Sequence, residues 1–168
     1  MDRRTSITLL RHGRLHEVGL GDLVDSFLPA GPGTTPPHSL QVALGLSPRH
    51  RPITNPVTET TKDPAPDVML RLAVADHPPL MVRPSQRVYL LAGGKMTTQR
   101  AEKVHPGDQL ASFPPHPIVS TERSVAHLRG VEITAIEQVP PEGKFVYTLQ
   151  VAQPLPGFIG NGDLFLHE

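Results

Sequence analysis

Histidine is the residue type in this sequence with the widest choice of chemistry, and no cysteine accompanies it. The chain has nine histidines in 168 residues and no cysteine, which excludes disulfides, thiolate metal sites and thiol catalysis. His12 and His16 are four residues apart, but across a strand and a turn this spacing does not bring two rings to one metal ion as it does on a helix. We therefore expect no metal site and no cofactor. Metal binding remains an open alternative through His12, His16, His38, His50, His77, His105, His116, His127 and His167.

The sequence lacks the patterns of several other function classes. It has no glycine-rich phosphate loop, no Ser-His-Asp order and no basic-aromatic motif for nucleic acids. Its 16 basic residues balance 16 acidic ones, whereas phosphate binding requires a clustered surplus of positive charge. No apolar run approaches the about 18–20 residues that span a bilayer, and the first residues lack a signal-peptide core. We expect a soluble, intracellular protein that binds neither nucleic acid nor a membrane.

Short segments rich in β-branched and aromatic residues must position any site in this chain. They alternate in part between apolar and polar residues, as half-buried strands do, and helical periodicity is weak throughout. We expect an all-β fold in a single domain over residues 1–168. The predicted strands are SITLL (6–10), VMLRLAV (68–74), RVYLL (87–91), VEITAI (131–136), FVYTLQV (145–151) and DLFLH (163–167).

Proline interrupts this pattern between the first two predicted strands. The chain has 20 prolines, many of them in residues 28–66. Proline lacks the amide donor and fixes φ, so this stretch cannot sustain a long helix. We expect a long, irregular, proline-rich excursion over 28–66, with one short helical turn near SLQVALGL (39–46).

Several phrases occur twice in the sequence and in the same order. Chance similarity among common turn sequences is the alternative, but four matched pairs favour an internal duplication of about 5–90 and 88–168. The pairs are VGLGDLVDSF (18–27) with VHPGDQLASF (104–113), TLLRHGRL (8–15) with YLLAGGKM (89–96), DVMLRLAV (67–74) with KFVYTLQV (144–151), and PSQRVYLL (84–91) with GNGDLFLH (160–167).

Glycine next to a short polar residue predicts turns in both copies. Glycine permits positive φ, and an aspartate side chain accepts amide hydrogens within a turn. Asparagine also tolerates the left-handed region. We expect the two Gly-Asp pairs to occupy equivalent turns related by a pseudo-two-fold axis, with Phe27 and Phe113 matching. The structural turn residues are Gly21, Asp22, Gly107, Asp108, Asn161 and Gly162.

Three blocks in this order resemble the Hint (hedgehog/intein) superfamily. The opening block is TSITLLRHGRLHEVGLGDLV, the middle block is LMVRPSQRVYLLAGGKMTTQRAEKVHPGDQL, and the closing block is VYTLQVAQPLPGFIGNGDLFLHE. The resemblance covers nearly the whole chain except part of the proline-rich stretch. It implies a Hint-like, pseudo-two-fold duplicated β fold with a long proline-rich loop.

The resemblance also implies autoprocessing chemistry. In the family a cysteine or serine attacks the carbonyl just upstream and converts an amide into a thioester or ester. A buried threonine and histidine polarise that amide and protonate its nitrogen. In inteins a terminal asparagine, helped by the preceding histidine, then cyclises. Hedgehog-type members instead pass the ester to an external alcohol.

The residues at the nucleophile and proton-transfer positions depart from the family. Family spacing puts the nucleophile about one residue before Met1, and the nearest hydroxyl, Ser6, lies inside the first predicted strand. The threonine and histidine positions of the middle block hold Arg83 and Gln86. An amide such as that of Gln86 donates a hydrogen bond but cannot shuttle a proton near neutral pH.

The closing block keeps one family residue and changes the others. A closing aspartate falls at Thr148, and a closing histidine falls near Pro156. His167 keeps its family identity, whereas Glu168 stands in place of the asparagine and cannot form the succinimide. His167, Glu168 and the positions at Arg83, Gln86 and Thr148 are therefore family motif positions without an assigned catalytic role.

These departures favour a degenerate Hint domain that has lost autocatalytic cleavage and splicing. Such a domain acts as a structural or protein-interaction module, and its partners are flanking polypeptide segments or another protein. The sequence therefore leans against an enzyme. The alternative is an autoprocessing, intein-like domain in a trimmed or mutated form.

Overall fold

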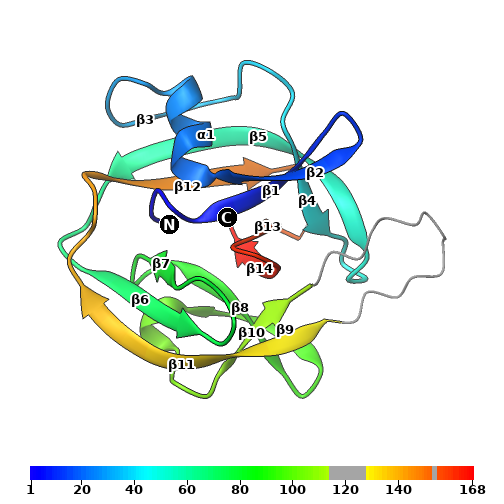
Figure 1. Cartoon of the computed structure of the whole chain (residues 1–168), viewed down its shortest axis with the longest axis vertical. Helices are drawn as coiled ribbons and strands as arrows, with labels where there is room; N and C mark the ends of the chain where they lie inside the picture. Colours follow the sequence, from blue (N-terminus) through cyan, green and yellow to red (C-terminus); the bar gives the residue numbers. More distant parts are fainter. Residues whose placement is uncertain (114–127, 153–154) are drawn as a thin grey trace.

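The protein folds into two curled antiparallel sheets, which the computed structural model describes over residues 1–113, 128–152 and 155–168. The two sheets face each other and enclose the core, and the two ends of the chain lie close together between them (Figure 1). This architecture confirms the predicted all-β fold. Each of the six predicted strands is present, and its ends lie within three residues of the predicted ones.

The first sheet has the strand order β12-β5-β4-β1-β2, with β3 added beside β5. β12 comes from near the end of the sequence and pairs with β5 over seven residues. The helix α1 follows β2 and covers part of this sheet (Figure 1). The bounds are β1 (Ser6–Arg11), β2 (Arg14–Gly19), α1 (Leu20–Phe27), β3 (Gly33–Thr35), β4 (Val42–Leu46), β5 (Pro52–Pro64) and β12 (Phe145–Val151).

The second sheet contains the run β6-β11-β10-β8-β9, with β7, β13 and β14 attached to it. A short 3₁₀ helix, η1, separates β9 from β10. The bounds are β6 (Met69–Val74), β7 (Leu80–Val82), β8 (Arg87–Ala92), β9 (Lys95–Arg100), η1 (Ala101–Lys103), β10 (Gln109–Ser112), β11 (Arg129–Val139), β13 (Gly157–Gly160) and β14 (Leu164–His167).

The two sheets repeat one pattern of strand pairing. In the order β12-β5-β4-β1-β2 and in the order β6-β11-β10-β8-β9, the first strand pairs with a long strand, which is followed by a short strand and a hairpin. The first strand of each order comes from the other half of the sequence, so the halves exchange β6 and β12. This repeat agrees with the predicted duplicated fold. The proposed limits of the two copies stay a prediction.

The two hairpins match residue by residue. β1 begins at residue 6 and β8 at residue 87, and β2 begins at 14 and β9 at 95, so both steps are 81 positions. Both turns use positive φ, at His12 and Gly13 in the first hairpin and at Gly93 and Gly94 in the second. The sequence similarity between residues 8–15 and 89–96 therefore corresponds to equivalent hairpins.

The repeated Gly-Asp phrases do not form equivalent turns, which corrects that prediction. Gly21 and Asp22 lie in the first turn of α1. Gly107 has φ +96° and Asp108 accepts a hydrogen bond from the His105 amide at 2.8 Å, so the second phrase is a turn that leads into β10. The positive φ of Gly107 is incompatible with a right-handed helix there.

Gly21 has a different reason to be glycine than the one predicted. Its φ is not positive, but a Cβ at this position would lie 2.3 Å from Cγ of Arg3 and 2.9 Å from Cα of Arg3. Leu20, Leu23 and Val24 form the buried stripe of α1 at helical spacing. The close approach of the N-terminal segment, and not a turn, therefore requires the glycine.

Residues 28–66 contain three strands, so the expected irregular excursion and the helical turn at 39–46 are wrong. β4 replaces the expected helical turn, and β5 spans 13 residues. Pro52 and Pro64 lie at the two ends of β5, and Pro56 lies where its partner changes from β4 to β12. A proline is tolerated in a strand where no ladder hydrogen bond needs its missing amide.

A buried ion pair ties α1 to the first sheet. Lys62 on β5 is 4% exposed, and its Nζ lies 2.6 Å from Oδ1 of Asp25 and 4.6 Å from the ring centroid of Phe145. Arg3 also hydrogen-bonds to Asp25. Burial opposes ionisation of Asp25, but the hydrogen bonds from Lys62 and Arg3 prevail and hold the pKa of this carboxyl below its ordinary value.

Candidate functional site

The two ends of the chain meet at a small cavity between the sheets. The backbone nitrogen of Met1 donates to the Tyr147 carbonyl of β12 at 3.0 Å, and the Tyr147 amide donates back at 2.8 Å. The Asp2 amide donates to the Met81 carbonyl of β7 at 3.2 Å. The first residues thus bridge the outer strands β12 and β7. The cavity is lined by Met1, Leu80, Val82, Gln86, Arg87, Val88, Leu110, Leu164, Phe165, Leu166 and His167.

Met1 is almost wholly enclosed at this place. The residue is 1% exposed. Burial, with the nearby Arg83 charge, lowers the pKa of the Met1 amine to about 5. The site therefore favours an uncharged backbone nitrogen. A thioether has no ionisable proton, so the Met1 side chain cannot act as the thiolate or alkoxide of a nucleophilic mechanism.

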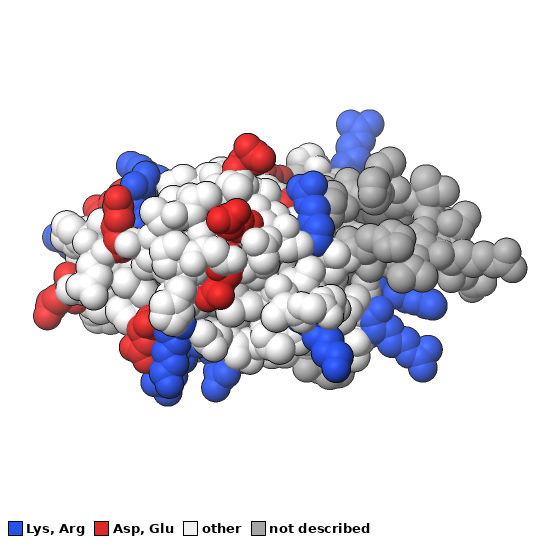
Figure 2. Space-filling model, turned by 90° about the horizontal axis from the view of Figure 1, so that it is seen from below, with Lys and Arg blue, Asp and Glu red and all other residues white. Residues whose placement is uncertain are grey.

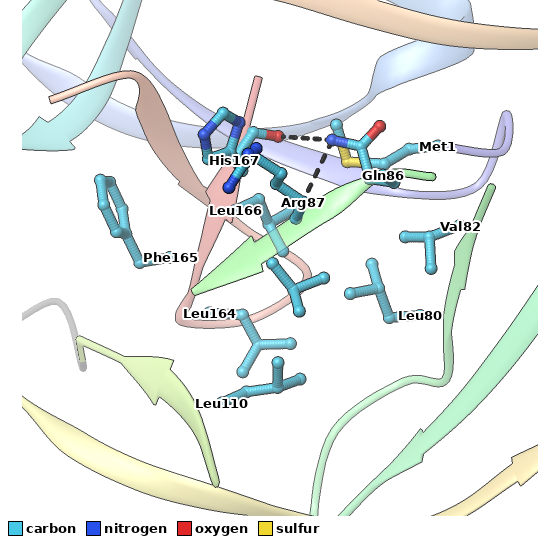
Figure 3. Close-up of a pocket in the computed structure, with 11 residues that line it drawn as sticks. Met1, Leu80, Val82, Gln86, Arg87, Leu110, Leu164, Phe165, Leu166 and His167 are labelled. Atoms are coloured by element: carbon cyan, nitrogen blue, oxygen red, sulfur yellow. Dashed lines mark hydrogen bonds between the residues drawn. The ribbon is translucent and has the colours of Figure 1, made fainter. Parts of the chain in front are cut away.

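Gln86 faces the last two residues of the chain. Its side chain is held in the loop between β7 and β8, where the Gln86 carbonyl accepts the Ala101 amide at 2.8 Å. Gln86 Nε2 donates to the Glu168 carbonyl at 2.7 Å. It also donates to the His167 carbonyl at 3.3 Å (Figure 3). This amide can polarise a carbonyl through a hydrogen bond, but it does not exchange a proton near neutral pH.

The Glu168 side chain binds a strand, whereas the family's asparagine at this position would cyclise. Its Oε1 accepts the Val151 amide of β12 at 2.8 Å. His167 Nδ1 lies 3.3 Å from the Glu168 carbonyl oxygen. The arrangement keeps a histidine beside the last carbonyl and fixes the carboxylate to the edge of a strand.

Tyr89 holds the His167 ring in place. The two rings stack with centroids 5.1 Å apart, and the Tyr89 hydroxyl donates to the Pro156 carbonyl at 2.9 Å. Burial, assisted by the Glu168 charge, raises the pKa of Tyr89 to about 12. Tyr89 therefore remains a neutral platform at physiological pH.

The structure brings together some of the predicted motif positions and not others. Gln86, His167 and Glu168 converge through the contacts above. Arg83 pairs instead with Asp63 at 3.3 Å, and Thr148 pairs in register with Thr61 of β5. Among the described residues, neither Arg83 nor Thr148 lines the cavity.

A polar network fixes the turn that leads into β14. The Asp163 carboxylate lies 2.5 Å from Nε2 of His77 and accepts hydrogen bonds from Ser112 and Arg129 at 2.7 and 2.8 Å. Burial opposes ionisation, but the hydrogen bonds from Ser112 and His77 hold the pKa of Asp163 below its ordinary value. In the same turn Asn161 has φ +50° and Gly162 has φ +91°.

Two site residues were not found from the sequence. Met1 lines the cavity, whereas family spacing puts the nucleophile position about one residue before it. That position stays a prediction. The sequence assigned Tyr89 only to a strand. Its rarity, in a chain with 4% aromatic residues, was the one signal that could have marked it as a site residue.

The described residues also bear on metal binding, membrane spanning and surface charge. In this part of the chain no group of three or more His, Asp or Glu side chains could hold a metal ion. His116 and His127 lie outside the described residues. Within the same residues no helix is both long and apolar enough to cross a membrane. On the face in Figure 2, basic and acidic side chains mix at one end and wide areas carry neither sign.

No family model and no curated protein matches this sequence. The fold, however, is similar to solved intein structures. An intein from a hyperthermophile superposes with a TM-score of 0.83 at 19% identity, covering 99% of this chain and 98% of that one. The Pab PolII intein gives 0.81 at 17% identity over 99% of both chains. The transcription factor IIB Mvu mini-intein gives 0.79 at 20% identity, covering 99% of this chain and 98% of that one.

Proposed function

We propose, from the premise that this chain has the Hint fold, that it is an intein-like domain without autocatalytic cleavage or splicing. It acts as a structural or protein-interaction module. Its partners are flanking polypeptide segments or another protein.

The occupants of one cavity carry this proposal. Met1 lines this cavity with a thioether, which cannot replace the thiol or hydroxyl of the family's chemistry, and Gln86 offers an amide where that chemistry requires a proton carrier. The Glu168 carboxylate is bound to the Val151 amide. Each of the three steps of the family mechanism therefore lacks the group that performs it.

A fusion protein tests the proposal. One reporter protein is joined before Met1 and a second after Glu168, and the intact mass is followed during incubation with a thiol or with hydroxylamine. We expect the full-length mass to persist. Release of either reporter would refute the loss of cleavage. A circular dichroism spectrum of the fusion, compared with the isolated domain, controls for folding.

Cleavage at the C-terminal side is the second candidate, and one contact favours it. Gln86 Nε2 donates to the Glu168 carbonyl at 2.7 Å, and His167 Nδ1 lies 3.3 Å from the same oxygen. A carbonyl that accepts such a hydrogen bond is a better electrophile. Release of the downstream reporter alone, abolished by Gln86→Ala, would support this candidate over the first.

A further inference from the structure

The outer edge of β12 carries free hydrogen-bonding groups beside Met1. In an antiparallel pair, opposite residues alternate between pairs that exchange both hydrogen bonds and pairs that exchange none. Tyr147 gives both of its backbone groups to Met1, so its pair with Lys62 of β5 is a non-bonded one. Two residues earlier, the pair of Phe145 with Pro64 is also non-bonded.

The residue type at Pro64 independently supports a pair of Phe145 and Pro64 that exchanges no hydrogen bonds. A proline has no amide hydrogen, so it cannot donate to the Phe145 carbonyl opposite it. The amide and carbonyl of Phe145 therefore point away from β5. Among the described residues, no hydrogen bond reaches either group from that outer side.

A groove lies directly beside this free edge. It has a volume of about 370 Å³, within the range of about 300–1,000 Å³ typical of ligand pockets. Phe145 forms a half-buried apolar wall, and the buried residues Met69, Met81 and Val146 form the floor. Methionine side chains adapt to different apolar groups, which suits a floor that receives a peptide side chain.

The rim of the groove has one cation that is not neutralised. Arg4 pairs with Glu142 at 2.9 Å, and Arg3 pairs with Asp22 and Asp25. Lys144 is exposed, and within the described residues no carboxylate lies within ion-pair distance of it. The rim is therefore complementary to an acidic group.

We propose that this groove, which we call the β12 groove, binds an extended peptide segment. The peptide exchanges hydrogen bonds with the amide and carbonyl of Phe145, as an added strand does at a sheet edge. An apolar side chain of the peptide packs on Met81 and Phe145, and a neighbouring carboxylate pairs with Lys144. This inference rests on the proposed role as a protein-interaction module and names the chemistry of its partner.

Titration with a designed peptide tests the proposal on the full chain. The probe is the N-acetylated, C-amidated heptapeptide TELTVET, and backbone amides are followed by heteronuclear NMR. We expect binding in the submillimolar range, the largest shift at the Phe145 amide, and at least tenfold slower hydrogen exchange there. The Gln150 amide belongs to the opposite edge of β12 and should not change.

Two matched controls make the assignment falsifiable. Lys144→Glu should weaken TELTVET binding at least tenfold and favour the lysine analogue TKLTVKT, whereas Lys95→Glu on β9 should change neither. No shift at 5 mM peptide would overturn the proposal, as would shifts confined to the edges of β2 or β9. The fusion-cleavage result is independent of this titration, so a failure here leaves the proposed loss of cleavage standing.

Discussion

The paired sheets and the cavity between the chain ends make different demands on their residues. The sheets require apolar side chains at alternate positions and a fixed register, and many sequences satisfy both. The cavity requires particular atoms, because only a nucleophile and a proton carrier can perform acyl transfer. At 17–20% identity the chain superposes closely on inteins, while the cavity holds Met1, Gln86 and His167. We therefore propose that the scaffold has persisted while its chemistry has changed.

The comparison predicts that stability resides in the sheets. Leu72 on β6 is fully buried between the two sheets. Leu72→Ala removes buried methyl groups and leaves a cavity, so we expect a loss of about 2–5 kcal/mol in the free energy of unfolding. Urea denaturation measures this value. Leu40→Ala is the matched control, since Leu40 is 77% exposed, and its effect should stay within about 0.5 kcal/mol. Equal effects of the two substitutions would contradict the description of the core.

A smaller loss is expected at the ion pair that holds α1. Asp25→Asn removes the negative charge beside the buried Lys62 ammonium and leaves it only neutral oxygen acceptors, the new side-chain amide and the Leu28 carbonyl. We expect a destabilisation of about 1.5–3 kcal/mol, the size of a hydrogen bond to a charged group. Asp67→Asn, at an exposed position, is the control and should be neutral. A neutral result for Asp25→Asn would show that this pair contributes nothing.

The lowered pKa values of Asp25 and Asp163 determine how the free energy of unfolding changes at acid pH. A carboxyl with a depressed pKa stabilises the fold above its unfolded pKa of about 4, and this contribution disappears as the pH falls through the folded pKa. We expect the free energy of unfolding to fall below about pH 4. In Asp163→Asn the fall should be shallower than in the native chain. An unchanged slope would contradict the role of the His77 and Ser112 contacts.

The smallest effect on stability is expected in the cavity. Gln86→Ala removes the hydrogen bonds to the last two carbonyls, so we expect a loss of about 1 kcal/mol, measured by thermal or urea unfolding. Gln86→Glu is a stricter probe, because it loses the amide donor and keeps the volume. A loss above about 3 kcal/mol in Gln86→Ala would show that the cavity contributes to stability as much as the sheets do, which would contradict the comparison.

Sequence reasoning succeeded where the determinants are local. The similarity of residues 8–15 and 89–96 was visible in the sequence, and both segments form hairpins whose turn residues take positive φ. The Gly-Asp phrases share letters but not structure. Leu20, Leu23 and Val24 have helical spacing in the first phrase, whereas Gly107 takes a positive φ in the second.

Other features depend on contacts that the sequence does not display. The prolines of β5 excluded a helix correctly, but whether a strand tolerates them depends on which amides its partners need. The place of Met1 depends on Tyr147, which is 146 positions away. Three of the family motif positions do converge in space, at Gln86, His167 and Glu168, and no catalytic role is assigned to them.

The central claim is that the cavity no longer supports cleavage, and the intact mass of the native fusion tests it most directly. The fusion with reporters before Met1 and after Glu168 is incubated for days at pH 6–9, beside a variant carrying Met1→Cys, Arg83→Thr, Gln86→His and Glu168→Asn. We predict that the native fusion keeps its full mass under every condition, and that the variant releases reporter protein. Any release from the native fusion at either junction would contradict the account.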